Sequence, residues 1–208
     1  MAVAEPAVSQ TVDIPGITRP MSYEEYMATP EEMARYDILD GWKVYRLYGD
    51  NLMPSPTRKH QRILGWLLRP FQDFEIQSKQ GEAIAAPCDV QITYQPLRSR
   101  QPDMLFISRA RLAKNLPAET YAPLSPAPEL VVEIVSPSDT SSVLSSKLAD
   151  YQTADVQEVW LLRPDARQVE VVQLAAQGYT RILYVMGDTA LSQVFPGLAV
   201  PVDSIFQE

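Results

Sequence analysis

The pattern of hydrophobic and polar positions changes its period along the chain, and each change marks a predicted element. From Thr57 onward apolar residues recur at helical spacing, which is typical of a helix with one buried face. Pro70 predicts a break or kink near the end of that helix. Over residues 90–94 apolar and polar residues alternate, as in a half-buried strand. Residues 130–135 are apolar on both faces, as expected for a central strand covered by helices on both sides.

Cap and turn residues mark further boundaries. Ser22 with Glu25 three residues later forms a capping box, which predicts a short helix ending near Pro30. Asp40-Gly41 supplies the positive φ angles of a tight turn and predicts a hairpin. The other expected elements are strands at 36–39, 43–47, 104–107, 159–162, 169–172 and 179–185, and helices at 109–114 and 142–153. The segment from Phe195 onward looks irregular.

Strands and helices mix along a chain of 208 residues, a length that suits one compact domain. We expect an α/β (α+β) fold, with a mixed central β-sheet flanked by helices on both sides. Residues 1–20 lack periodicity, so we expect a flexible N-terminal arm before a single domain over residues 21–208. No apolar run reaches the ~18 residues of a membrane span, and the first residues do not resemble a signal peptide. We therefore expect a cytoplasmic protein with no membrane segment.

Composition removes several classes of chemistry. The chain has one cysteine, Cys88, and one histidine, His60. An internal disulfide and a zinc site built from clustered His and Cys are therefore excluded. None of the eight glycines lies in the spacing of a dinucleotide-binding loop, a P-loop or a nucleophile elbow.

The net charge of −8 argues against a general polyanion-binding protein, because the long-range field of the chain repels phosphate. The charge is unevenly spread, however, and two local clusters are basic. These clusters consist of Arg98, Arg100, Arg109, Arg111 and Lys114, and of Arg58, Lys59 and Arg62. They fit transient contact with nucleic acid, and they fit an ordinary solvated surface slightly better.

Glu133 interrupts the strand that is apolar on both faces. Strand periodicity puts it on the same side as Val131 and Val135, so it does not belong to a wet face. An ionised carboxylate buried there costs several kcal/mol unless something compensates its charge. Two explanations are open: Glu133 pairs with an arginine near the end of the strand, or it is a metal ligand or acid–base group.

Asp103 directly precedes another predicted strand, and with Glu133 it forms a candidate pair. Two carboxylates at the ends of neighbouring strands can bind one hard cation and leave positions for water and a substrate phosphate. Lys147 lies on the next predicted helix, four residues before Tyr151 and therefore on the same helix face. Its ammonium group can thus point back towards the strand ends.

These residues resemble the PD-(D/E)XK restriction-endonuclease-like superfamily, and in particular a family of small proteins assigned as nucleases that is abundant in photosynthetic bacteria. The similarity covers residues 20–206. It rests on the following stretches: Tyr36-Asp37-Ile38-Leu39-Asp40-Gly41, His60-Gln61-Arg62-Ile63, Pro102-Asp103-Met104, Glu133-Ile134-Val135-Ser136-Pro137-Ser138, Lys147-Leu148-Ala149-Asp150-Tyr151 and Val156-Gln157-Glu158-Val159-Trp160.

The resemblance implies that Asp103 and Glu133 are metal-binding acids, joined by the main-chain carbonyl of Ile134, and that Lys147 is the active-site lysine. The usual superfamily lysine, two residues after the acid, is Val135 here, and this family moves it to the following helix. Asp37 stands where the family has Glu, and it is expected to assist catalysis or a second metal. Asp155 replaces a frequent glycine.

From this resemblance we expect an endonuclease that hydrolyses phosphodiester bonds of nucleic acid, with DNA as the expected substrate and Mg²⁺ or Mn²⁺ as cofactor. A homodimer is expected on the same basis. The residues expected to hold substrate phosphates are Arg98, Arg100, Arg58, Lys59 and His60. Two alternatives are open: a catalytically inactive nuclease-fold protein that binds nucleic acid or dimerises, and a metal-free glycosidase with two carboxylates, for which no aromatic platform is evident.

Overall fold

The computed structural model describes residues 19–29, 36–45, 47–48, 51–52, 56–117, 120, 122–136 and 139–207. Most of the expected N-terminal arm, together with Pro30 and Pro137, lies outside the described residues.

A six-stranded sheet forms the centre of the molecule, in the order β12-β11-β10-β9-β8-β5. Its strands are β5 (Gly81–Ala85), β8 (Met104–Ser108), β9 (Leu130–Ile134), β10 (Glu158–Arg163), β11 (Gln168–Leu174) and β12 (Tyr179–Tyr184). Strands β9 and β10 are parallel, and the other neighbours are antiparallel, so the predicted mixed sheet is confirmed. All five residues of β9 are buried, as their two-sided apolar pattern predicts.

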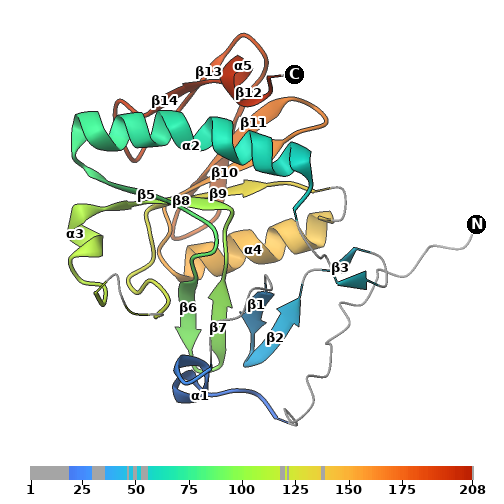
Figure 1. Cartoon of the computed structure of the whole chain (residues 1–208), viewed down its shortest axis with the longest axis vertical. Coiled ribbons are helices and arrows are strands. Elements are labelled where there is room, and N and C mark those ends of the chain that lie inside the picture. Colours follow the sequence, from blue (N-terminus) through green and yellow to red (C-terminus); the bar gives the residue numbers. More distant parts are fainter. Residues whose placement is uncertain are drawn as a thin grey trace, which may run out of the picture.

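Helices cover both faces of this sheet (Figure 1). Helix α2 (Arg58–Ser78) packs on one face together with the C-terminal elements, and α4 (Ser141–Thr153) packs on the other. Leu144, Leu148 and Tyr151 of α4 are buried, as predicted. The short helix α3 (Arg109–Leu112) follows β8 directly. The expected arrangement of a mixed sheet between helices is therefore correct.

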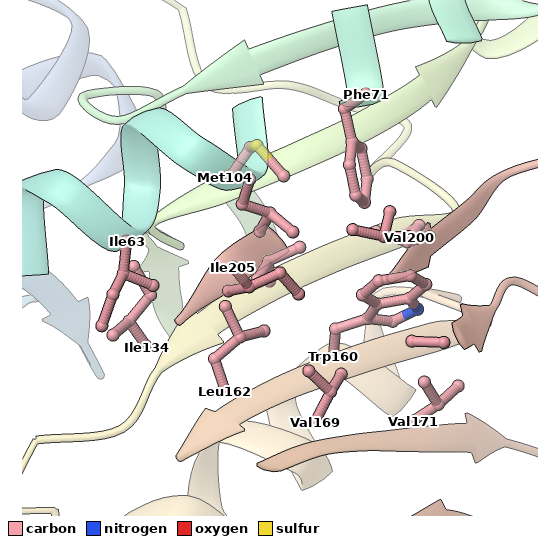
Figure 2. Packing of buried hydrophobic residues seen from close by; sticks show 14 of the residues in the cluster. Ile63, Phe71, Met104, Ile134, Trp160, Leu162, Val169, Val171, Val200 and Ile205 are labelled. Atoms are coloured by element: carbon pink, nitrogen blue, oxygen red, sulfur yellow. The ribbon is translucent and has the colours of Figure 1, made fainter. Parts of the chain in front are cut away.

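Pro70 does not end helix α2, which begins after the N-cap Thr57 and continues to Ser78. The expected break is wrong because packing outweighs the loss of about 3 kcal/mol that an interior proline causes. Phe71, the next residue, is fully buried, and its ring packs edge-on against Trp160 with centroids 5.5 Å apart. Figure 2 shows Phe71 above Trp160 in this core.

A second, four-stranded sheet has the order β2-β1-β7-β6. It comprises β1 (Tyr36–Leu39), β2 (Trp42–Tyr45), β6 (Val90–Tyr94) and β7 (Leu97–Arg100). The predicted hairpin joins β1 and β2, and Asp40 and Gly41 adopt φ angles of 53° and 84°. Ser22 and Glu25 form the predicted capping box of α1 (Tyr23–Met27), which lies beside this sheet (Figure 1). A two-stranded ladder joins β3 (Leu47–Tyr48) and β4 (Asn51–Leu52).

The C-terminal segment is ordered, in contrast to the irregular structure expected from Phe195 onward. Strands β13 (Thr189–Leu191) and β14 (Ala199–Pro201) pair, and helix α5 (Val202–Ile205) follows at once. Val200 and Ile205 are fully buried in the core that α2 covers (Figure 2). These elements are too short for a period to show, and α5 has no capping side chain to mark its start.

No helix in the described part of the chain is long and apolar enough to cross a membrane.

Two glycines give a matched test of this packing. A Cβ at Gly81 would lie 2.1 Å from the Ile107 carbonyl oxygen, so Gly81→Ala forces β5 away from β8. At Gly65 in α2 a Cβ meets nothing within 4 Å. We expect Gly81→Ala to lower the free energy of unfolding by about 2 kcal/mol or more, as overpacking does. Gly65→Ala should raise it by about 0.5–1 kcal/mol through helix propensity. Urea unfolding followed by circular dichroism measures both, and equal effects would contradict the packing described.

Candidate active site

Glu133 is the centre of a buried polar cluster between β9 and α4. Glu133 is 2% exposed, and each of its carboxylate oxygens accepts a hydrogen bond from a side chain of α4. Lys147 Nζ donates to Oε2 at 2.8 Å, and the Tyr151 hydroxyl donates to Oε1 at 2.6 Å. The two donors lie four residues apart, so one helix face brings both to the same carboxylate. The charge of Glu133 is therefore compensated by a lysine, and the arginine pairing considered above does not occur among the described residues.

Tyr151 is a neutral donor in this cluster. Burial, followed by the negative charge of Glu133, raises the pKa of Tyr151 well above its usual value. Its hydroxyl therefore keeps its proton and holds Glu133 Oε1 through a directional hydrogen bond. Lys147 has a second acid nearby, because Asp139 Oδ1 lies 3.9 Å from its Nζ.

Asp103 lies beside Glu133 on the neighbouring strand. Met104 pairs with Val132 in the antiparallel ladder, and the Asp103 amide donates to the Val132 carbonyl at 3.1 Å. The Asp103 side chain is fully buried, and its Oδ2 accepts from the Ile134 amide at 2.7 Å. The backbone of Ile134, the residue whose carbonyl is expected to bind metal, thus adjoins the Asp103 carboxylate. Asp103 and Glu133 thus lie at neighbouring ends of β8 and β9.

His60 reaches the same place from helix α2. Its Nε2 lies 3.2 Å from Asp103 Oδ1, while its buried Nδ1 has no hydrogen-bond partner. Thr57 orients this end of α2, because its hydroxyl accepts from the His60 amide at 3.2 Å. The lone histidine of the chain is therefore a contact of the candidate site.

Asp37 belongs to a second buried cluster, which adjoins the first. Arg100 NH1 donates to Asp37 Oδ2 at 2.9 Å, and Arg100 Nε donates to Asp150 Oδ2 at 2.6 Å. Burial acts against the charge of Arg100, but Asp37 and Asp150 outweigh it and raise the pKa of Arg100. The charges of Asp37 and Arg100 both act on Tyr151, which places this cluster next to the Glu133 group.

The cations expected to hold substrate phosphates differ in their surroundings. Arg100 is only 4% exposed and holds two acids, so it is not placed to contact a phosphate in this conformation. Arg98 pairs with Asp150 at 2.6 Å and with Asp40 at 3.0 Å. Arg58 and Lys59 are exposed at the start of α2, and Lys59 pairs with Asp165 at 2.7 Å.

The pair of carboxylates has the donor chemistry of a Mg²⁺ or Mn²⁺ site. In the part of the chain that the structure describes, no group of three or more His, Cys, Asp and Glu side chains gathers closely enough to hold an ion. Mg²⁺ does not need such a cage, because it retains waters and is bound by one or two carboxylates. Asp103 and Glu133 supply two, both of them hard oxygen donors. The residues present therefore fit a hard divalent cation.

Comparison with known proteins identifies the family of the chain. A family model described as "Uma2: Putative restriction endonuclease" matches residues 23–203. The chain belongs to the Uma2 family. This membership confirms the predicted relation to the restriction-endonuclease-like superfamily, and it supports a nuclease-type function.

The Uma2 chain also resembles a solved structure. A crystal structure titled as a putative nuclease belonging to DUF820, from Anabaena variabilis, is similar with a TM-score of 0.68 at 18% sequence identity. The match covers 90% of this chain and 98% of that one, and it shows a shared fold. A comparison with curated proteins gives no match.

Three residues of the Uma2 chain that contact the candidate site were not predicted from the sequence. The sequence places Tyr151 on the inner face of its helix but does not show that its hydroxyl binds Glu133. Asp150, beside it, holds Arg98 and Arg100, and Asp139 approaches Lys147. The i, i+4 spacing of Lys147 and Tyr151 could have indicated that both side chains reach Glu133. The partners of Asp150 lie on β7, and no local pattern in the sequence identifies them.

Arg100 gives the clearest stability test. We expect Arg100→Leu to lower the free energy of unfolding by about 3–5 kcal/mol, because it removes the buried cation that Asp37 and Asp150 share. The matched control is Lys59→Leu, which breaks the exposed pair with Asp165 and should change stability by less than about 1 kcal/mol. Urea unfolding measures both variants. A similar small loss for Arg100→Leu would show that the second cluster is solvated rather than buried.

Proposed function

We propose that the chain is an endonuclease that hydrolyses phosphodiester bonds of nucleic acid and requires Mg²⁺ or Mn²⁺. One observation supports this proposal most directly: the buried Glu133 carboxylate accepts a hydrogen bond from Lys147, on the strand that neighbours Asp103. The ends of two neighbouring strands bring together two acids, a buried lysine and an adjacent histidine. Such a set of groups is suited to phosphoryl chemistry. Membership in the Uma2 family supports the same reaction.

Asp103, Glu133 and the main-chain carbonyl of Ile134 would hold the cation. A divalent ion in such a site supplies Lewis-acid stabilisation of the phosphate and lowers the pKa of bound water. The fully buried Asp103 is fixed by the Ile134 amide, which orients one oxygen before any substrate arrives. His60 contacts its other oxygen and restricts its rotation.

Lys147 places a positive charge inside the site. Its Nζ is held 2.8 Å from Glu133, and its side chain is 4% exposed. A buried ammonium acts through a lower effective dielectric than a surface one, so it stabilises developing negative charge on a phosphate more strongly. Tyr151 fixes the opposite oxygen of Glu133 and is a positioning residue. Asp37 assists the centre through Arg100.

The remaining parts of the proposal concern the substrate and its surroundings. Sequence-independent phosphate contacts suit the exposed Arg58 and Lys59, together with His60 and Arg98. We exclude Arg100 from this set because it is buried between acids. DNA as substrate, a homodimer that reaches both strands of a duplex, and a cytoplasmic location complete the proposal.

A second function is favoured by one observation. Both oxygens of Glu133 and both oxygens of Asp103 already have protein partners. A site that is satisfied by its own side chains is compatible with a nuclease fold that binds nucleic acid without cutting it.

Cleavage assays test the proposal. We expect the wild type to cleave plasmid and single-stranded DNA with Mg²⁺ or Mn²⁺ and to lose this activity in EDTA. Glu133→Gln should lower the rate by about 10²-fold or more, because it removes a charged ligand and the partner of Lys147. The control is Glu24→Gln, an exposed acid on α1, which should keep wild-type activity. Equal rates for Glu133→Gln and wild type would reject the assignment.

Calorimetric titration with Mn²⁺ separates the two functions. Binding that Asp103→Asn abolishes supports the enzyme. No heat of binding at millimolar Mn²⁺ for the wild type, together with retained DNA binding, favours the non-cleaving protein.

The role of Tyr151 as a positioning residue gives a separate prediction. We expect Tyr151→Phe to lower kcat by about tenfold with little change in KM, since loss of a partner behind a ligand typically weakens function 10–100-fold. Tyr94→Phe is the control, because its hydroxyl contacts only the surface residue Ser125. Steady-state kinetics on a labelled oligonucleotide measures the split. An unchanged kcat would show that the Tyr151 hydroxyl serves stability alone.

A further inference from the structure

The outer surface of helix α2 carries a concentration of positive charge on an otherwise acidic chain. Residues 51–72 include no Asp or Glu, although the whole chain has 26 acids and a net charge of −8. The cations in this stretch are Arg58, Lys59, Arg62 and Arg69. All four are exposed on the helix.

The three arginines among these cations lie along one side of α2. Spacings of four and seven residues return Arg58, Arg62 and Arg69 to nearly the same direction, over about 16 Å of helix. Gly65 lies between Arg62 and Arg69 on the same side, and a Cβ there would meet nothing within 4 Å. We call Arg58, Arg62 and Arg69 the basic ridge. A gap without a side chain therefore separates its second and third cations.

No acidic side chain among the described residues pairs with a member of the basic ridge. Arg62 instead lies over the ring of Trp66, with its Cζ 4.6 Å from the ring centroid. The arginines elsewhere in the fold are different, since Arg98, Arg111 and Arg163 each bind at least one carboxylate. An arginine that is held by an aromatic face keeps its charge available for an anion.

The start of α2 also departs from the usual charge pattern of helices. Acids are favoured in the first turn, where the helix dipole is positive, and cations there cost about 0.3–1 kcal/mol each. Helix α2 has no acid in its first turn and begins with Arg58 and Lys59. The unfavourable placement concentrates positive potential at the helix end that carries His60, which contacts Asp103 at 3.2 Å.

We propose that the basic ridge, with Arg62 held in place by Trp66, binds the phosphate backbone of a nucleic acid strand as it leaves the candidate active site. The proposal rests on the proposed function for the position of the scissile bond, because Arg58 and Arg62 lie two residues before and after His60, at the end of α2 that reaches the candidate site but on its outer face. Guanidinium groups bind phosphate oxygens in a bidentate geometry and do not read bases. The ridge therefore supplies affinity without sequence preference.

Nucleic acid fits this surface better than another polyanion. The cations form a narrow line along the outer face of α2, and Figure 1 shows α2 running across the sheet from the end at which β9 finishes. A linear polymer of regularly spaced phosphates can follow such a line. An acidic protein or an anionic membrane would need a broad basic face, whereas this surface offers one narrow line of cations.

Fluorescence anisotropy with a labelled DNA oligonucleotide, single-stranded and duplex, tests the ridge in EDTA, where no metal-dependent cleavage interferes. We expect the double variant Arg62→Gln/Arg69→Gln to weaken binding by about tenfold or more at 50 mM salt. The slope of log K against log salt should fall by about 1.4–1.8, since each of the two lost phosphate contacts contributes about 0.7–0.9. The matched control is Lys79→Gln/Lys114→Gln, which removes two exposed charges elsewhere and should change affinity less than twofold.

Each outcome decides the proposal. No DNA binding by the wild type, or equal losses in the ridge and control variants, overturns it. Equal ridge-dependent binding to polyglutamate or to phosphatidylserine vesicles also overturns it, because the surface is then a general anion site. Both double variants should unfold at the wild-type temperature, since the substituted side chains are exposed. Ridge-dependent DNA binding without cleavage by the wild type would reject the proposed endonuclease activity and leave the ridge in place.

Discussion

The buried ion pair between Glu133 and Lys147 is the constraint on which the rest of the site depends. A carboxylate in a strand with all five residues buried is tolerated only with a charge partner and full hydrogen bonding. Helix α4 provides both through Lys147 and Tyr151. The position of α4 over the sheet is therefore fixed by charge as well as by apolar packing. A helix that packs on the core and supplies the site in this way couples the stability of the fold to its chemistry.

The same helix also joins the two sheets. Asp150 of α4 binds Arg100, which in turn binds Asp37 in the four-stranded sheet. Asp103 follows Arg100 by three residues and directly precedes β8 of the six-stranded sheet. One short connection therefore carries charged residues of both clusters. Displacement of either sheet would separate a buried cation from its acids. This arrangement explains how side chains from distant parts of the sequence hold positions close to Glu133.

The sequence predicts those parts of the site that follow from local periodicity. An acid within a run of apolar residues identifies Glu133, and the i, i+4 spacing relates Lys147 to Tyr151. Strand β7 and the partners of Asp150 could not be predicted, because β7 is buried through ion pairs rather than apolar residues. Pro70 misleads for a related reason, since long-range packing of Phe71 decides the helix. Asp155 adopts a φ of 61°, in the left-handed region that glycine enters without strain. This conformation accounts for the glycine that the family resemblance leads us to expect at this position.

Satisfied carboxylates and a cation site are compatible because the partners can be exchanged. Each carboxylate oxygen has two acceptor directions, so a single donor does not exhaust an oxygen. Lys147 is attached through a flexible four-carbon chain, and Asp139 lies 3.9 Å from its ammonium group. A shift of Lys147 towards Asp139 would free one oxygen of Glu133 without leaving the ammonium unpaired. The Tyr151 hydroxyl would meanwhile keep the other oxygen in place. The buried lysine thus stabilises the fold through Glu133, and Asp139 is a second acid within its reach.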